Sequence, residues 1–206
     1  MPRWLQAAFL AATFSSLTLA PALAAGGYAP PPGITLVASA PANALQLRSP
    51  QSSGKKVHLD PKFMRQVVPY QSEQSAGTVV VNTGAKFLYL VLGNGKALRY
   101  GIGTARDGFE WSGTHHITRK AEWPGWTPPA EMKQRRPDLP DYMPGGLNNP
   151  LGARALYIGS TIYRIHGTNE PWTIGGDVSS GCIRMVNDDV IDLYSRVKIG
   201  AKVIVL

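Results

Sequence analysis

The chain has 206 residues, with 21 Lys and Arg against 13 Asp and Glu, a formal net charge of +8, and a single cysteine. One cysteine excludes an intrachain disulfide, so a packed apolar core must stabilise the fold. The positive net charge favours an anionic surface such as cell wall or lipid headgroups. A nucleic-acid partner has little support, because the Lys and Arg residues are scattered along the sequence rather than arranged in stripes.

After Arg3, residues 4–20 form the apolar stretch WLQAAFLAATFSSLTLA, and small residues follow in APALAA. A positive charge, an apolar stretch and a small-residue site are typical of a secretory signal peptide, here residues 1–24. The alternative is an uncleaved membrane anchor, but Pro21 and several hydroxyl side chains make the stretch short for a span. We therefore expect export to the periplasm or cell wall, with no stable membrane span after cleavage.

Residues 25–76 are predicted to form a tether rich in Pro, Ala and Ser, because no amphipathic period of useful length occurs there. Within it, residues 58–70 (HLDPKFMRQVVPY) are interpreted as a short docking segment. The composition changes at Gly77, where β-branched and aromatic runs begin. We therefore predict one domain over residues 77–206.

The first part of this domain is predicted to be antiparallel strands joined by tight turns. The runs GTVVVNT, KFLYLVLG and NGKALRYGIG are rich in apolar residues and are separated by turn residues around Gly84 and Gly95. Residues 104–150 contain many Pro and Gly residues. They are predicted to be long loops of the kind that cover binding sites, with a short strand at 114–119.

The last part is predicted to contain the strands ARALYIG and TIYRIHG, one helix, and the closing strand KVIVL. Asn187 is interpreted as the N-cap of the helix, with Asp188 and Asp189 in its first turn and apolar residues on one face. The sequence therefore predicts a mainly β domain with long loops and one helix near the C-terminus.

The single cysteine lies in SSGCIRM, where the neighbouring Ser and Gly residues offer little to bury it, and this favours a reactive thiol. A thiolate needs a partner to form near neutral pH, and His166, at the end of a predicted strand, is the candidate base. Alternation along an extended CIRM places Cys182 and Arg184 on one face and Ile183 and Met185 toward the core. From spacing alone, an inert buried thiol with a structural histidine is the alternative.

A metal site has little support in the sequence. Four His and one Cys show no zinc-ligand spacing. His115 and His116 are adjacent, so on a strand they point to opposite faces, and both are interpreted as structural. We expect no metal and no cofactor.

The segment IHGTNEPWTIGGDVSSGCIRM resembles the signature of the L,D-transpeptidase catalytic domain, a YkuD-like family of peptidoglycan cross-linking cysteine transpeptidases. That signature is a His-Gly pair followed downstream by Ser/Thr-x-Gly-Cys-hydrophobic-Arg/Asn. The similarity extends over about residues 77–206 and includes GTVVVNTGAKFLYLV and TRKAEWPGWTPP. It implies a β domain of the sandwich-like or barrel-like kind found in this family.

The resemblance also implies chemistry on peptidoglycan stem peptides. Cys182 would attack the bond between the third-position diamino acid and D-Ala of a tetrapeptide stem, releasing D-Ala and leaving a thioester. An amine of an acceptor stem would resolve the thioester as a 3-3 cross-link, or an amine of a wall-anchored lipoprotein would do so. Two alternatives stay open: an L,D-carboxypeptidase in which water resolves the thioester, and a catalytically silent wall-binding protein.

Carried over residue by residue, the resemblance makes Cys182 the nucleophile and His166 its base. The carbonyl of Gly167 would orient the imidazole. The amides of Ser180, Gly181 and Cys182 would form the oxyanion hole.

Arg184 and Trp172 would bind the substrate, the guanidinium through a stem carboxylate and the indole as a flat apolar wall. Trp123 and Trp126 are further candidates for such a wall, with ordinary packing of the loops as the alternative. The sequence departs from the family at one position. Many members have a histidine directly before Gly-Cys, where this chain has Ser180. His166 is therefore the only histidine with a claim to the role of base.

Overall fold

The computed structural model describes residues 59–206, so the predicted signal peptide and most of the predicted tether lie outside the described residues. In chain order the elements, with η for a 3-10 helix, are η1 (Pro61–Phe63), β1 (Gln66–Pro69), β2 (Val79–Asn82), β3 (Phe87–Gly93), β4 (Lys96–Gly101), β5 (Thr104–Ala105), β6 (Gly113–Glu122), α1 (Ala130–Arg135), β7 (Arg154–Ile158), β8 (Arg164–His166), η2 (Pro171–Thr173), β9 (Asp177–Ser179), β10 (Ile183–Arg184), α2 (Asn187–Arg196) and β11 (Lys202–Val205).

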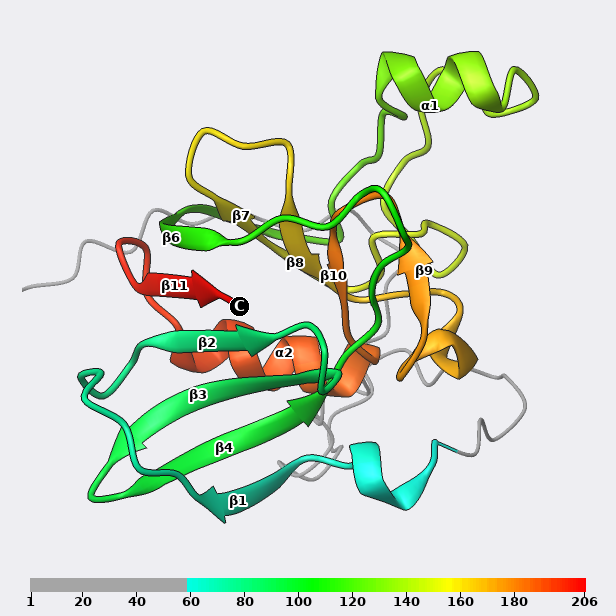
Figure 1. Cartoon of the computed structure of the whole chain (residues 1–206). Coiled ribbons are helices and arrows are strands. Elements are labelled where there is room, and N and C mark those ends of the chain that lie inside the picture. Colours follow the sequence, from blue (N-terminus) through cyan, green and yellow to red (C-terminus); the bar gives the residue numbers. More distant parts are fainter. Residues whose placement is uncertain (1–58) are drawn as a thin grey trace, which may run out of the picture. The chain divides into compact units, whose positions relative to one another are not determined.

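Nine strands form one sheet in the order β1-β4-β3-β2-β11-β6-β7-β8-β10, and β5 and β9 form a small parallel pair. The strand β11 joins the two halves of the large sheet, because it pairs parallel with β2 and antiparallel with β6. Figure 1 shows β1 to β4 on one side and β6, β7 and β8 on the other, with β11 between them. Since β1 and β10 end the strand order within residues 59–206, this sheet is open and is not a closed barrel.

Both halves of the sheet and the helix α2 contribute to one apolar core. Val79, Leu88 and Tyr100 from the first half are fully buried, as are Ile158 from the second half and Leu193 from α2. Burial of such side chains is the main favourable term in folding. The prediction of a mainly β domain is confirmed, because its apolar runs form strands that share this core.

The sheet begins before residue 77. Strand β1, within the predicted docking segment, pairs antiparallel with β4, with Gln66 opposite Arg99 and Pro69 opposite Lys96. Proline has no N–H for a strand ladder, so its place in an edge strand is physically consistent. Four residues are too few to show an alternating pattern in the sequence, and this strand was not predicted.

The long segment 104–150 contains more regular structure than its composition suggests. The predicted short strand is the longer β6, and α1 is a helix that was not predicted. The helix follows Pro128 and Pro129, which suits a helix start. No residue of α1 is buried, so the sequence carries no apolar period from which the helix could have been recognised.

The helix α2 is the predicted C-terminal helix, but its N-cap differs from the prediction. Val186 holds the N-cap position without a side-chain hydrogen bond, and Asn187 is the first helical residue. The side-chain oxygen of Asn187 instead accepts hydrogen bonds from the amides of Ala153 (2.9 Å) and Thr168 (3.3 Å). Asn187 therefore fixes the loop that follows β8 rather than its own helix.

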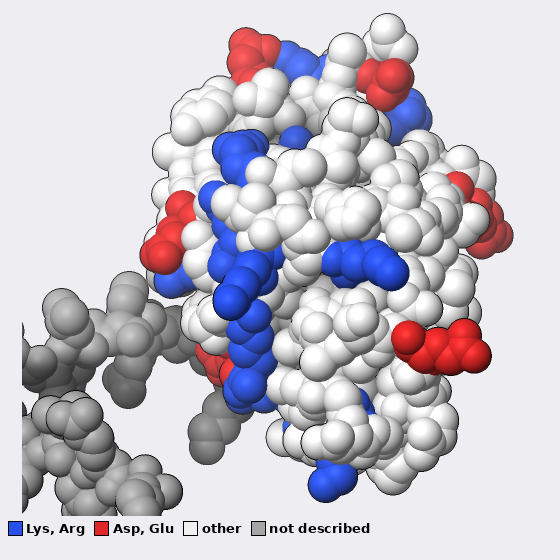
Figure 2. Space-filling view, turned by 90° about the vertical axis from the view of Figure 1, so that its left-hand side faces the viewer, with Lys and Arg blue, Asp and Glu red and all other residues white. Residues whose placement is uncertain are grey.

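Among residues 59–206, no helix combines the length and apolarity needed to cross a membrane. On the face shown in Figure 2, Lys and Arg side chains form a vertical band, and acidic side chains lie toward the outline. Basic residues that are scattered along the sequence are therefore gathered into a band on this face, contrary to the expectation from the sequence, and the band suits an anionic partner.

Candidate active site

Two adjacent parallel strands bring the predicted nucleophile and base to one cavity. In the pairing of β8 with β10, Ile165 lies opposite Ile183 and His166 lies opposite Arg184. Cys182 directly precedes β10, and both Cys182 and His166 line a cavity of about 320 Å³. Residues that are distant in the sequence share this cavity because their strands pair.

Much of the apolar wall of the cavity comes from the long segment 104–150 that was predicted to be a cover. The other lining residues are Phe109, Trp126, Pro129, Glu131, Met132, Arg135, Pro150, Leu151, Ile162, Tyr163, Arg164, Ser179, Ser180 and Arg184. The cavity therefore combines apolar walls with three arginines. An apolar cavity with a few convergent polar groups is the usual form of a ligand site.

The alternation predicted for CIRM is confirmed. Ile183 is 2% exposed and Met185 is fully buried, whereas Cys182 and Arg184 are only partly buried. The two apolar side chains anchor the strand in the core. As a result, the sulfur and the guanidinium face the cavity.

His166 is buried, and its ring has a defined orientation. Its Nδ1 lies 2.5 Å from the carbonyl oxygen of Gly167. A carbonyl oxygen only accepts hydrogen bonds, so Nδ1 carries the proton and Nε2 keeps its lone pair. Burial lowers the pKa of His166 to about 3, the charge of Arg184 acts in the same direction, and the bond to Gly167 opposes them. The imidazole is therefore neutral near neutral pH.

The thiol of Cys182 is also neutral at rest. Burial raises its pKa, and the guanidiniums of Arg164 and Arg184 act in the opposite direction. The two arginines thus favour the thiolate, although they do not outweigh burial. At rest, the cavity therefore contains a neutral thiol and a neutral imidazole.

Close packing behind the sulfur requires glycine at position 181. Gly181 has a φ of +107°, and a Cβ there would lie 2.2 Å from the ring of Tyr163. The ring of Trp111 stacks on Tyr163 at 4.4 Å, and the Trp111 indole N–H donates to the carbonyl oxygen of Gly181 (2.7 Å). This stack fixes the peptide that precedes the cysteine.

The hydroxyl of Ser179 forms hydrogen bonds with two residues of the segment that is predicted to form the oxyanion hole. Its hydroxyl donates to the carbonyl oxygen of Cys182 (2.5 Å) and accepts from the amide of Gly181 (3.2 Å). One of the three predicted oxyanion donors therefore has a partner at rest. The side chain of Ser180 accepts a hydrogen bond from Arg106 (3.0 Å) and lines the cavity.

The two residues predicted to bind substrate lie in different environments. Arg184 lines the cavity and forms an ion pair with Glu170 (2.9 Å). Trp172, on η2, is 68% exposed and is not among the residues that line the cavity. Trp126 does line it, so the indole at the cavity wall comes from the long segment 104–150.

Sequence reasoning missed four residues that shape the site, namely Trp111, Tyr163, Arg164 and Glu170. One of them left a signal, because Arg164 precedes His166 by two positions in a predicted strand and must share its face. The other three act through packing or ion pairing. Such contacts follow from how the chain folds and leave no local pattern in the sequence.

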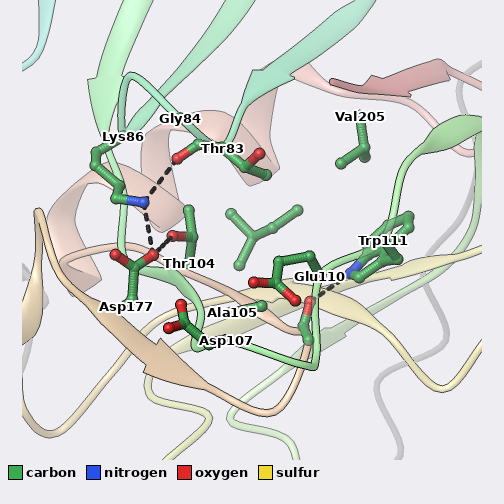
Figure 3. A pocket seen from close by; sticks show the side chains of 12 residues that line it. Thr83, Gly84, Lys86, Thr104, Ala105, Asp107, Glu110, Trp111, Asp177 and Val205 are labelled. Atoms are coloured by element: carbon green, nitrogen blue, oxygen red, sulfur yellow. Dashed lines mark hydrogen bonds and ion pairs between the residues drawn. The ribbon is translucent and has the colours of Figure 1, made fainter.

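A second cavity, of about 240 Å³, has Gly181 among its lining residues, and Figure 3 shows Lys86, Thr104 and Asp177 close together in it. In it, Lys86 bonds to the carboxylate of Asp177 (2.6 Å), which also accepts from the Thr104 hydroxyl (2.8 Å). The Lys86 bond, and then the Thr104 bond, lower the pKa of Asp177. Within residues 59–206, no group of three or more His, Cys, Asp or Glu side chains could hold a metal ion.

Comparison with known proteins identifies the family. Residues 76–205 match the model of the L,D-transpeptidase catalytic domain, named YkuD. This match covers more than half of the chain, and the chain belongs to that family. The predicted resemblance is thereby confirmed.

Individual relatives match part of this chain and part of their own length. The chain is 39% identical over 134 residues to the probable L,D-transpeptidase ErfK/SrfK of Escherichia coli (strain K12), covering 61% of this chain and 42% of that protein. The chain therefore spans less than half the length of this relative. A solved structure of the Ldtfm-avibactam carbamoyl enzyme has a TM-score of 0.52 at 18% identity, covering 65% of this chain and 49% of that one, and it supports the fold alone.

A crystal structure from Brucella melitensis, described as a probable carnitine operon oxidoreductase, is 46% identical to this chain. It covers 72% of this chain and 96% of its own, with a TM-score of 0.49. That description belongs to the Brucella melitensis protein and is not carried over to this chain.

Proposed function

We propose that this protein is a peptidoglycan L,D-transpeptidase with Cys182 as its nucleophile. The observation that carries the proposal is that Cys182 and a neutral, oriented His166 line one cavity, in a chain that belongs to the L,D-transpeptidase catalytic domain family. The substrate is a tetrapeptide stem. The bond broken lies between its third-position diamino acid and the terminal D-Ala.

In the acylation step, Nε2 of His166 takes the proton from Sγ of Cys182 as the sulfur bonds to the carbonyl carbon. The hydrogen bond from Nδ1 to Gly167 keeps Nε2 available for this proton. The imidazolium then gives the proton to the leaving nitrogen as the C–N bond breaks. D-Ala departs with its amine, and the stem stays on the enzyme as a thioester.

The negative charge that develops on the carbonyl oxygen needs donors close to the sulfur. We assign this role to the amides of Ser180, Gly181 and Cys182. The amide of Gly181 bonds to the Ser179 hydroxyl at rest, at 3.2 Å. That distance is at the long end for a hydrogen bond, so a charged oxyanion would compete well with the neutral hydroxyl.

Arg164 and Arg184 would stabilise the transient thiolate, because both lower the pKa of Cys182 against the effect of burial. We also assign Arg184 to binding the stem. Its ion pair with Glu170 holds the guanidinium at the cavity wall, next to His166 in the sheet. Trp172 is too exposed to form a wall of this cavity, so its proposed role is limited to contacts outside it.

Resolution of the thioester by an amine is favoured over hydrolysis. Phe109, Trp126 and Met132 give the cavity apolar walls that limit water, and this supports a transpeptidase over an L,D-carboxypeptidase. The acceptor amine belongs to a second stem, giving a 3-3 cross-link, or to a wall-anchored lipoprotein. We further propose that the protein is exported to the periplasm or cell wall, on the basis of the predicted signal peptide.

The test is to incubate the purified protein with a disaccharide-tetrapeptide and to weigh the products by mass spectrometry. Transpeptidation gives a dimer lighter than two monomers by one alanine, and this is the expected result. Only a tripeptide monomer would indicate a carboxypeptidase. Neither product, with the thiol intact, would indicate a silent wall-binding protein and contradict the proposal.

A further inference from the structure

One guanidinium close to the sulfur has no acidic partner. Arg184 is paired with Glu170, whereas Arg164 forms no ion pair with any of residues 59–206. Nη1 of Arg164 donates to the carbonyl oxygen of Ile162 (3.1 Å), and its Nε is buried without a hydrogen-bond partner. The Nε of Arg164 is thus a buried donor without an acceptor, which is costly, so this guanidinium is suited to bind an anionic acceptor from a ligand.

The sheet register places Arg164 beside the nucleophile. Ile165 lies opposite Ile183, so the residues that precede them, Arg164 and Cys182, are also neighbours across the two strands. Arg164 lines the same cavity as Cys182 and its charge acts on the sulfur. A group bound by this guanidinium therefore lies next to the reacting carbonyl.

Packing on the other side fixes the guanidinium of Arg164. Tyr157 lies opposite Arg164 in the β7–β8 pair and opposite Arg119 in the β6–β7 pair. The Cζ atoms of Arg119 and Arg164 lie 3.5 and 5.3 Å from the centroid of the Tyr157 ring. Arg119, Tyr157 and Arg164 thus form a row of two cations and an aromatic ring across the sheet. Arg164 is the end of this row that lies next to Cys182.

In the proposed reaction, an amine whose carbon also carries a carboxylate can take part twice, first as the leaving group and then as the acceptor. The leaving amine belongs to D-Ala, whose nitrogen-bearing carbon also carries a carboxylate. If the acceptor amine is that of meso-diaminopimelate, its carbon carries a carboxylate in the same position. Because the entering amine occupies the place that D-Ala has left, one cation beside the sulfur can serve both.

We propose that Arg164 binds the carboxylate next to the reacting amine, first in the leaving D-Ala and then in the entering acceptor, and so selects acceptors of the amino-acid type. This assignment rests on the proposed function. In the second step the acceptor nitrogen bonds to the acyl carbon and the C–S bond breaks. The amine proton passes through His166 to the sulfur, which restores the thiol and the neutral imidazole.

Arg135 is the other guanidinium in the cavity without an ion pair among the described residues. It lies on α1, with its Cζ 5.0 Å from the ring of Phe109. The guanidiniums that lower the pKa of Cys182 are those of Arg164 and Arg184, not that of Arg135. Of Arg135 and Arg164, it is therefore Arg164 that is placed to bind a carboxylate next to the reacting bond.

The test offers the thioester two acceptors at equal concentration. The full chain is acylated with a disaccharide-tetrapeptide, and the acceptors are tripeptides that differ only in having meso-diaminopimelate or L-lysine at position three. The wild-type protein should form the meso-diaminopimelate product in excess by about tenfold or more, because lysine lacks the carboxylate. Arg164→Gln should bring the product ratio close to one.

The product ratio reports on a thioester common to both acceptors, so slower acylation does not affect it. Arg164→Lys keeps the charge and should keep part of the preference, which also provides a ratio if Arg164→Gln does not acylate. The matched control is Arg99→Gln, which removes a guanidinium stacked 4.2 Å from the centroid of Phe87 in the other half of the sheet. It should keep the wild-type ratio.

A second arm compares donors that end in D-Ala or in D-alaninamide. The wild-type protein should acylate more slowly with the amide, and Arg164→Gln should treat the two donors alike. The assignment is overturned if wild type does not discriminate, or if the preference survives in Arg164→Gln and is lost in Arg135→Gln or Arg184→Gln. A wild-type protein that forms no acyl-enzyme overturns the proposed function and this assignment with it, whereas an acyl-enzyme without acceptor preference overturns only the assignment.

Discussion

The two cavities lined by residues of the Ser180–Cys182 segment differ in how their polar groups are paired. In the smaller cavity, Lys86, Thr104 and Asp177 satisfy one another at normal hydrogen-bond distances. In the larger one, burial keeps the thiol and the imidazole neutral, and Arg164 lacks an acidic partner within residues 59–206. Groups that satisfy one another contribute to stability, whereas groups left without partners are available for a ligand. The comparison predicts that substitutions in the two cavities have different consequences.

The largest effect is expected from removing the nucleophile. A carbapenem offers a strained β-lactam carbonyl to the thiol, and intact-mass measurement should show one covalent adduct on the wild-type protein. Cys182→Ala should show none, because the chain contains no other thiol. Ser180→Ala is the matched control and should still be acylated. An adduct on Cys182→Ala would contradict the assignment.

A large effect is also expected from Gly181→Ala. The new methyl group would meet the Tyr163 ring, and the φ of +107° is unfavourable for alanine. Carbapenem acylation should slow by about a hundredfold, because the amides beside the sulfur move. The double variant with Tyr163→Ala removes the clash but keeps the backbone strain. It should recover part of the rate, and full recovery would show that the φ requirement is unimportant.

The buried imidazole predicts an unusual dependence on pH. Because the pKa of His166 is about 3 in the folded protein and near 6.5 when exposed, the unfolded chain binds the extra proton between these values. Stability therefore rises with pH across this window and is lost as the pH falls from about 6.5. Between pH 7 and pH 4, wild type should lose on the order of 3 kcal/mol more unfolding free energy than His166→Gln, as measured by urea titration.

Asp189, whose pKa burial raises to about 6, acts in the opposite direction, but it is present in both proteins and cancels in the difference. The acylation rate of wild type should also stay level from pH 7 to about pH 5, since the imidazole stays neutral. An inflection of the rate near pH 6.5 would show that His166 is more exposed to solvent than the structure indicates.

The smallest effect is expected in the other cavity. Lys86→Met removes the ion pair with Asp177, which is half exposed, so the loss of unfolding free energy should be below about 1 kcal/mol. Carbapenem acylation should be unchanged within about twofold, because neither residue lines the cavity that contains Cys182. A large loss of acylation would mean that the two cavities are coupled through the Gly181 segment, and the distinction between them would fail.

The sequence by itself determined the features that are encoded locally. Apolar, β-branched and aromatic runs between turn residues defined most strands, and CIRM showed which side chains face the core because a strand has a period of two. The His-Gly and Ser-Gly-Cys segments indicated the family, and they led to the proposed roles of Cys182 and His166. The acidic first turn and apolar face indicated α2, although the N-cap assigned to Asn187 was wrong.

Only the tertiary structure decided which groups meet and which charges they carry. The parallel pairing of β8 with β10 places Arg164 beside Cys182, and no local pattern encodes that register. The stack of Trp111 on Tyr163 and the ion pair of Arg184 with Glu170 join segments that are separate along the chain. The neutrality of the thiol and the imidazole depends on burial, which exists only once the core has formed around them.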